Sequence, residues 1–140
     1  MEKIIQALRK NGYKITPQRR AVILAFLECD KFLTVQQIVD FVKQTNPDVS
    51  TDTVYRNLDI LIQLGLVYEI HMHNREGNVF ELVISGHHHH LVCLKCGDME
   101  CMENCPMNEQ YFAEAEKKGF SITRHTFEVY GYCKKCKENK

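Results

Sequence analysis

The chain has 140 residues, of which 44% are hydrophobic and 26% are charged, and its formal net charge is zero. This composition excludes a globally disordered protein and suits one or two small domains. No apolar run approaches the roughly 20 residues that a membrane-spanning helix needs, and the first residues lack a secretory pattern, so we expect a cytoplasmic protein without a membrane partner.

The first twenty residues are strongly basic. They contain six Lys and Arg residues against one acidic residue, Glu2, whereas residues 98–116 contain six acidic residues and no Lys or Arg. Apolar residues at helical spacing predict an amphipathic helix from Met1 to about Lys10. This uneven charge distribution is compatible with one face that docks on phosphates, despite the zero net charge.

Three further helices are predicted in the first half of the chain. Thr16-Pro17 is a helix start, because a threonine can cap a helix and a proline suits its first position. Thr34 and Gln37 have the spacing of a capping box. Ser50 can cap the last of these helices.

The residue pattern changes from helical to strand-like after residue 65. The stretches LVYEIHMH (66–73) and NVFELVI (78–84) favour β-strands, and Gly77 supplies a turn between them, so they predict a hairpin. Helices followed by a hairpin are the parts of a winged helix-turn-helix. We therefore expect an α+β chain with a winged-helix DNA-binding domain over residues 1–84 and a small α/β domain over residues 85–140.

The helix predicted after Ser50 is the candidate DNA-reading element. Its apolar residues fall on one side, as expected if that side packs on the preceding helix while the other side enters the major groove. The planar fork of Arg56 matches guanine O6 and N7. Other candidate contacts to a base or the DNA backbone are Tyr55, Thr51 and Thr53. The alternative is an ordinary amphipathic helix whose polar side is only solvated.

The second half of the chain is predicted to contain a strand at HHHHLVC (87–93), a helix over residues 105–119 and a strand over residues 120–133. Seven cysteines in a reducing compartment favour metal thiolates over disulfides, and their odd number excludes complete pairing. Two Cys-x-x-Cys pairs can place four thiolates around one Zn²⁺. This structural site, which leaves no open position for catalysis, would use Cys93, Cys96, Cys133 and Cys136.

The four consecutive histidines form two pairs, each of which could supply two ligands to one metal ion. Neighbouring side chains on a strand point to opposite faces, so His87 shares one face with His89, and His88 shares the other with His90. Further ligands would come from Glu69, His71, His73, Glu81 and His125. Imidazole suits Zn²⁺, Cu²⁺, Ni²⁺ and Fe²⁺. A solvated polar strand is the alternative.

Cys101 and Cys105 are left over from the predicted structural site. They could supply a soft metal site or a redox switch, or they are thiols without a special role. A metalloenzyme would need an open metal position, a general base and a substrate pocket. The sequence contains no HExxH motif and no nucleophile elbow, so we expect no enzyme and no small organic substrate. A metal-storage protein would bind metal without preferring any DNA sequence, and neither class explains the winged-helix half.

Five stretches in this order resemble the ferric uptake regulator superfamily of metal-responsive bacterial repressors, over nearly the whole chain. They are YKITPQR, DTVYRNLDIL, LGLVYEI, HHHHLVCLKCG and HTFEVYGYCKKC. The resemblance implies a winged helix followed by an α/β dimerisation domain, with metal sites at the hinge. It also implies a homodimer that binds double-stranded operator DNA.

The resemblance assigns roles to individual residues. It implies a structural zinc site at the four cysteines of the two Cys-x-x-Cys pairs. It implies a sensing site at the hinge that contains Glu81, His88 and His90. It implies a further site in the dimerisation domain that contains His87, His89 and His125. It implies DNA contacts from Lys14, Tyr55 and Arg56.

The chain departs from the iron and peroxide sensors of this superfamily. They bring a histidine from just before the helix at Thr34, where this chain has Phe32 and Leu33. We expect a hairpin residue, Glu69, His71 or His73, to take its place. The further site usually adds a carboxylate at the position of Asn108, next to Glu109.

The stretch ENCPM (103–107) is similar to the zinc uptake repressors of the superfamily. We therefore expect a repressor that binds a palindromic operator as a dimer when loaded with Zn²⁺ and controls metal-uptake genes. The alternative is a regulator that responds to ferrous iron or peroxide, with Fe²⁺ or Mn²⁺ as its regulatory ion.

Overall fold

The computed structural model of the chain describes residues 1–29, 32–72, 77–83 and 87–138. It forms two compact units, Met1–Ser85 and Gly86–Lys140. The boundary predicted between residues 84 and 85 falls on residues that the structure does not describe. Within the described ranges, none of the helices has the length and apolar character needed to cross a membrane.

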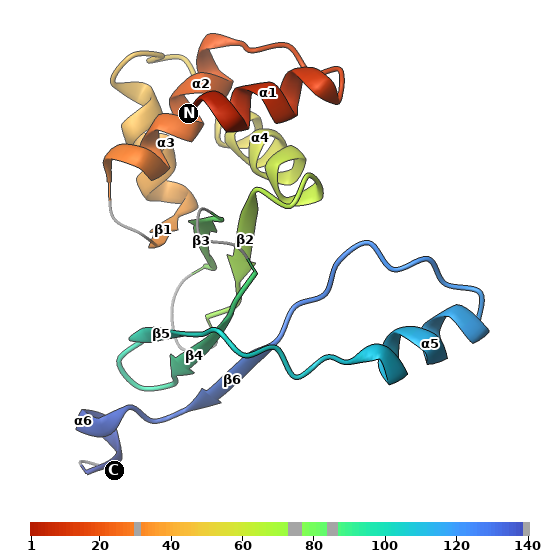
Figure 1. Cartoon of the computed structure of the whole chain (residues 1–140). Coiled ribbons are helices and arrows are strands. Elements are labelled where there is room, and N and C mark those ends of the chain that lie inside the picture. Colours follow the sequence, from red (N-terminus) through yellow and green to blue (C-terminus); the bar gives the residue numbers. More distant parts are fainter. Residues whose placement is uncertain (30–31, 73–76, 84–86, 139–140) are drawn as a thin grey trace. The chain divides into compact units, whose positions relative to one another are not determined.

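In the described part of the first unit, the helices are α1 (Glu2–Lys10), α2 (Pro17–Glu28), α3 (Val35–Lys43) and α4 (Thr51–Gln63), as labelled in Figure 1. The last three begin at the predicted caps. The side chains of Thr16 and Ser50 each accept a hydrogen bond from the backbone N–H three residues later. Thr34 and Gln37 form the predicted capping box. These starts are confirmed, because each cap satisfies a backbone donor that has no partner inside its own helix.

The first unit also contains a small antiparallel sheet. Its strands are β1 (Phe32–Thr34), β2 (Val67–Ile70) and β3 (Val79–Leu82), in the order β1-β3-β2. The predicted hairpin is confirmed by the pairing of β2 with β3. The apolar sides of α2, α3 and α4 form the core, in which Val22, Ile38 and Leu58 are fully buried. The order of elements expected for a winged helix-turn-helix is therefore present.

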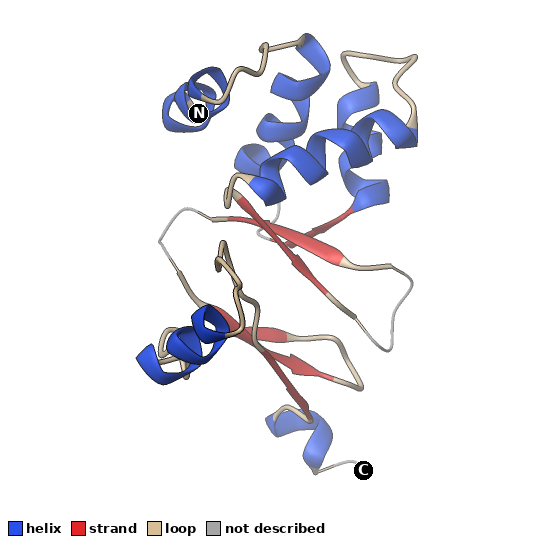
Figure 2. Cartoon of the chain, turned by 90° about the vertical axis from the view of Figure 1, so that its right-hand side faces the viewer, coloured by secondary structure: helices blue, strands red, loops and turns tan. Residues whose placement is uncertain are grey.

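The second unit is built on another three-stranded sheet (Figure 2). Its strands are β4 (His89–Cys93), β5 (Met99–Met102) and β6 (Glu128–Gly131), in the order β5-β4-β6. β5 lies antiparallel to β4, and Gly97, with φ of 81°, permits the tight turn between them. β6 lies parallel to β4, so the chain must cross over before β6. The crossover contains α5 (Glu109–Lys117), and α6 (Lys134–Lys137) follows β6.

The α+β architecture is confirmed, but two expectations for individual elements were wrong and two strands were not predicted. The helix predicted over residues 105–119 begins only at Glu109, because Asn108 caps it. The strand predicted over residues 120–133 is confined to Glu128–Gly131, the residues that pair with β4. β1 and β5 were not predicted, because each is defined by pairing with a strand distant in sequence or beyond a turn.

Candidate metal centres

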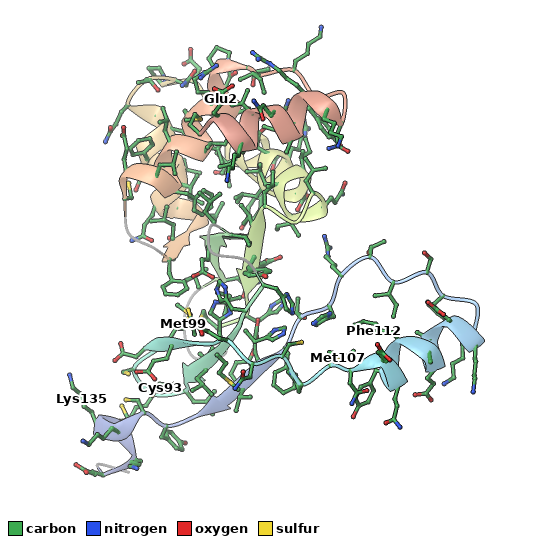
Figure 3. All side chains as sticks on the ribbon, viewed as in Figure 1. Glu2, Cys93, Met99, Met107, Phe112 and Lys135 are labelled. Atoms are coloured by element: carbon green, nitrogen blue, oxygen red, sulfur yellow. The ribbon has the colours of Figure 1, made fainter. Side chains whose placement is uncertain are left out.

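The two Cys-x-x-Cys pairs come together in the second unit. Cys93 ends β4 and Cys133 caps α6, so strand pairing between β4 and β6 brings the pairs to one end of the sheet. Figure 3 labels Cys93 and Lys135, which mark the two contributing segments. The sulfur atoms of all four residues lie within 4.8 Å of one another.

The spacing of these sulfurs fits a tetrahedral zinc site. The Sγ atoms of Cys96 and Cys133 are 3.7 Å apart. Two thiolates at a Zn–S distance of 2.3 Å in a tetrahedron would be about 3.8 Å apart. All seven cysteines belong to the described residues, and none forms a disulfide. The group can therefore hold one Zn²⁺ with four thiolates.

The electrostatics of the four-cysteine group favour a cation once all four thiols are deprotonated. Hydrogen bonds from the backbone N–H groups of Cys96 and Cys133 lower the pKa of Cys93 to about 6. Burial, together with hydrogen bonds to the neighbouring thiols, raises the pKa of Cys136 to about 12. The first thiolate therefore forms readily, whereas the last does not form beside three others unless a positive ion compensates their charge.

The histidine run separates into two pairs, as the alternation of side chains along an extended segment predicts. The rings of His87 and His89 have centroids 4.5 Å apart, and His125 lies 4.7 Å from His87 and 5.2 Å from His89. The rings of His88 and His90 are 4.9 Å apart. One short segment therefore supplies two separate pairs of imidazoles.

Cys105 joins the first histidine group. Its Sγ lies 3.4 Å from Nε2 of His87, 3.2 Å from Nε2 of His89 and 3.2 Å from Nε2 of His125. The sequence left this cysteine without an assigned role, because it is distant along the chain from all three histidines. The group contains three imidazole nitrogens and one sulfur, which together suit Zn²⁺.

Two histidines of this group are held in the form that binds metal. Burial, followed by the neighbouring His87, lowers the pKa of both His89 and His125. Both imidazoles are therefore neutral at neutral pH and keep a nitrogen lone pair for an ion.

Cys101 joins the second histidine pair. It lies on β5 directly opposite His90 of β4, and its sulfur lies within 4.8 Å of the ligand nitrogens of His88 and His90. The turn at Gly97 sets this register. The sequence identified both histidines but not the thiol, because β5 was not predicted.

The remaining predicted ligands lie in the first unit. Glu81 is on β3, where it is paired in register with Tyr68 of β2. Glu69 accepts a hydrogen bond of 2.9 Å from the side-chain amide of Asn78. His71 is exposed just after β2, and within the described part of this unit neither Glu69 nor His71 belongs to a cluster of candidate ligands. The third hairpin candidate, His73, lies outside the described residues.

The helix proposed to read DNA has one buried and one exposed side. Val54, Leu58 and Leu61 of α4 are fully buried. On the other side Arg56 and Thr51 are exposed, and 44% of Tyr55 is exposed. The remaining candidates are Thr53, whose hydroxyl lies 2.9 Å from that of Ser50, and Lys14, which is exposed before α2. α4 thus presents the expected polar side to solvent.

The sequence did not identify Asn57, a buried residue of α4. Its side-chain oxygen accepts a 2.8 Å hydrogen bond from Nε of Arg19 in α2, and its amide nitrogen donates to the carbonyl of Thr53. Asn57 therefore fixes α4 against α2 by a polar contact. The signal in the sequence is its position on the apolar side of the helix, three residues after Val54 and four before Leu61.

Comparison with known proteins gives a consistent result. The model of the ferric uptake regulator family matches residues 10–130. The chain is 32% identical over 136 residues to the ferric uptake regulation protein of Staphylococcus aureus, with 96% of each chain covered. It is 30% identical over 138 residues to the peroxide-responsive repressor PerR of Staphylococcus epidermidis, covering 99% of this chain and 91% of that protein.

The fold is shared with solved structures. The Helicobacter pylori ferric uptake regulator superposes with a TM-score of 0.68 at 23% identity, over 97% of this chain and 90% of that one. The Vibrio cholerae ferric uptake regulator superposes with a TM-score of 0.60 at 27% identity, over 92% of this chain and 98% of that one. The chain therefore belongs to the ferric uptake regulator family, whose members are transcription regulators, which confirms that it is not an enzyme.

Proposed function

We propose that this protein is a cytoplasmic, zinc-dependent transcriptional repressor of the zinc uptake repressor branch. It binds palindromic operator DNA as a homodimer and controls metal-uptake genes. The observation that carries the proposal is the composition of the ligand groups in the second unit. Each group contains at least one cysteine, and thiolate ligands favour Zn²⁺, whereas Mn²⁺ prefers oxygen donors.

The four-cysteine group is proposed as the structural zinc site. It joins the end of β4 to α6 through Cys93, Cys96, Cys133 and Cys136. A bound ion there would stabilise the sheet, because four thiolates without a cation repel one another. The site has no open coordination position, so its role is structural.

The sensing site is proposed at His88 and His90, with Cys101 and with Glu81 from the first unit. Because Glu81 belongs to a different unit from the histidines, an ion held by all of them would couple the two units. Glu69 and His71 are the candidates for a further ligand from the hairpin. Metal binding would then favour the arrangement of units that binds DNA.

The required free energy is modest for such a site. Moving a two-state equilibrium from 1:99 to 99:1 needs about 5.5 kcal/mol of differential binding. Several ligand bonds that form only in the DNA-binding arrangement can supply this. The dimer would then present its two α4 helices to successive major grooves, about one helical turn apart.

The homodimer is supported by an apolar surface on the second unit. Leu91 of β4 and Val129 of β6 are paired in register, and both are exposed, at 38% and 39%. Phe127 and Tyr132 are also exposed, at 37% and 48%. Exposed apolar residues on and beside one sheet are typical of an interaction surface, and a second copy would cover it.

The second candidate function is a regulator that responds to ferrous iron or peroxide. It is favoured by the relatives at 32% and 30% identity, a ferric uptake regulation protein and a peroxide-responsive repressor. The two candidates differ in the regulatory ion, which is Zn²⁺ in the first and Fe²⁺ or Mn²⁺ in the second.

Selection of bound sequences from random DNA tests both candidates. The purified protein is incubated with the DNA pool in the presence of Zn²⁺, Fe²⁺, Mn²⁺ or a chelator. We expect a palindrome to be enriched with Zn²⁺ and not with the chelator. Enrichment with Fe²⁺ or Mn²⁺ alone would favour the second candidate, and enrichment that is equal in all four conditions would exclude metal-dependent DNA binding.

A further inference from the structure

We propose that Cys105 is the fourth ligand of a closed site with His87, His89 and His125, and that this site takes a thiophilic divalent ion such as Zn²⁺ or Co²⁺. This inference rests on the proposed function only in assuming that the chain binds regulatory metal. It gives Cys105 the role of a metal ligand. It also names the chemical class of ion at a site separate from the sensing histidines.

Three ring nitrogens converge on one sulfur atom. The Sγ of Cys105 lies 3.2–3.4 Å from Nε2 of each of the three histidines. A thiol carries one hydrogen and so can donate to only one of these nitrogens. In a tetrahedral site with Zn–N of about 2.0 Å and Zn–S of about 2.3 Å, each nitrogen would lie about 3.5 Å from the sulfur. A small outward shift of the side chains therefore admits an ion.

The four ligands come from three separate segments of the second unit. His87 precedes β4 and His89 is its first residue, Cys105 follows β5, and His125 precedes β6. The crossover between Cys105 and His125 carries α5, which stands away from the sheet on a long connection (Figure 1). α5 has no buried residue of its own. An ion in this group would therefore fix both ends of the crossover to β4.

The neighbouring oxygen donors do not complete the group. The Asn108 side chain accepts a 3.0 Å hydrogen bond from the backbone N–H of Gln110 and so is used as the cap of α5. Glu109 is exposed in the first turn of that helix. The thiol of Cys105 is thus the donor that the fold presents to the three histidines.

A set of three imidazoles and one thiolate has a definite preference among ions. Soft thiolate and imidazole ligands suit Zn²⁺ and Co²⁺, whereas Mn²⁺ prefers oxygen donors. Four protein ligands also fill a tetrahedral ion, so no position remains open. Replacing Cys105 by aspartate would introduce an oxygen donor and shift the preference toward Mn²⁺.

Cobalt spectroscopy tests the ligand directly. The full chain, with its four-cysteine site filled with Zn²⁺, is titrated with Co²⁺, and the thiolate-to-cobalt charge-transfer band is recorded for the parent, Cys105→Ser and Cys29→Ser. Cys29 is an exposed cysteine at the end of α2 in the first unit, and so serves as the matched control. We expect Cys105→Ser to lose a component of the band that Cys29→Ser retains. Identical spectra for all three proteins would overturn the proposal.

A second test measures how far Zn²⁺ protects the thiols of the parent chain from alkylation, and it needs no variant. The protein is alkylated with iodoacetamide with and without added Zn²⁺, and the modified cysteines are identified by mass spectrometry. We expect Zn²⁺ to slow the alkylation of Cys105 at least tenfold, and that of Cys29 not at all. Equal alkylation of Cys105 in both conditions would overturn the proposal. Neither measurement involves DNA, so a protein that binds this ion but no operator would refute the proposed function alone.

Discussion

Tyr130 is an ionisable residue of β6 whose surroundings keep it protonated. Its hydroxyl donates a hydrogen bond to the carboxylate of Glu128. Burial, and then this carboxylate, raises the pKa of Tyr130 to about 12. The unfolded chain has a tyrosine pKa of about 10, so above pH 10 it loses a proton that the folded chain retains. This contribution to stability is complete below pH 10 and is lost as the pH rises toward 12.

Glu128→Gln tests this account of Tyr130. We expect the pKa of Tyr130 to fall only part of the way toward its ordinary value, because burial, the larger cause, remains. The measurement is the alkaline titration of the tyrosinate absorption band, with Tyr130→Phe subtracted to isolate one of the six tyrosines. An unchanged titration in Glu128→Gln would show that the carboxylate has no influence.

Arg56 lies on the exposed side of α4 and is the proposed contact to a base. We expect Arg56→Ala to weaken operator binding by about 1–3 kcal/mol and to relax the base preference at one position. The measurement is the affinity for the selected operator and for a set of singly altered operators. Lys14→Ala is the comparison, because a phosphate contact weakens binding to all sequences alike. A uniform loss with Arg56→Ala would make Arg56 a phosphate contact as well.

At the scale of elements, the apolar core stabilises the first unit, and we propose that the four-cysteine site stabilises the second. α6 spans only Lys134–Lys137, which is too short to be stable alone, and it contains a single buried residue, Cys136. The binding free energy of a structural zinc, about 10–16 kcal/mol in zinc-finger peptides, becomes free energy of folding. An ion bound by the four cysteines would therefore hold α6 to the sheet.

Cys96→Ser removes one ligand of this group. We expect the second unit to unfold and the dimer to dissociate, because three thiolates hold the ion poorly. Circular dichroism melts and the molecular mass in solution measure the two effects, with Cys29→Ser as a control that keeps both at the parent values. A normal melt and a dimer mass in Cys96→Ser would contradict a structural role for the site.

The elements that could be predicted from the sequence are those set by local contacts. The caps at Thr16, Thr34 and Ser50 use partners three residues away, and the period of two along β4 separates the histidine pairs. β1 and the role of Cys105 depend on contacts between residues far apart in the chain. No local pattern carries that information. The sequence therefore predicted the histidines of the candidate sites and the four-cysteine group. It did not place Cys101 and Cys105 beside the histidines.

At the scale of the whole molecule, the proposed mechanism depends on one ion that both units bind. His87 and His88 are adjacent in sequence but belong to different groups of candidate ligands. Of the two groups, only the one that contains His88 is proposed to include a ligand from the first unit. A regulatory ion can shift the equilibrium only by its difference in affinity for the two arrangements. The effect of metal on DNA binding should therefore depend on His88 much more than on His87.

His88→Ala tests this dependence, with His87→Ala as the matched variant. We expect both variants to remain folded dimers, because the four-cysteine site is intact. Operator affinity of His88→Ala in Zn²⁺ should fall at least tenfold, toward that of the chelated parent, since a shift from 1:99 to 99:1 requires about 5.5 kcal/mol. The measurement is operator binding against free zinc concentration. If His88→Ala follows zinc as the parent does, or if His87→Ala loses as much, the ion that couples the two units is not held at His88.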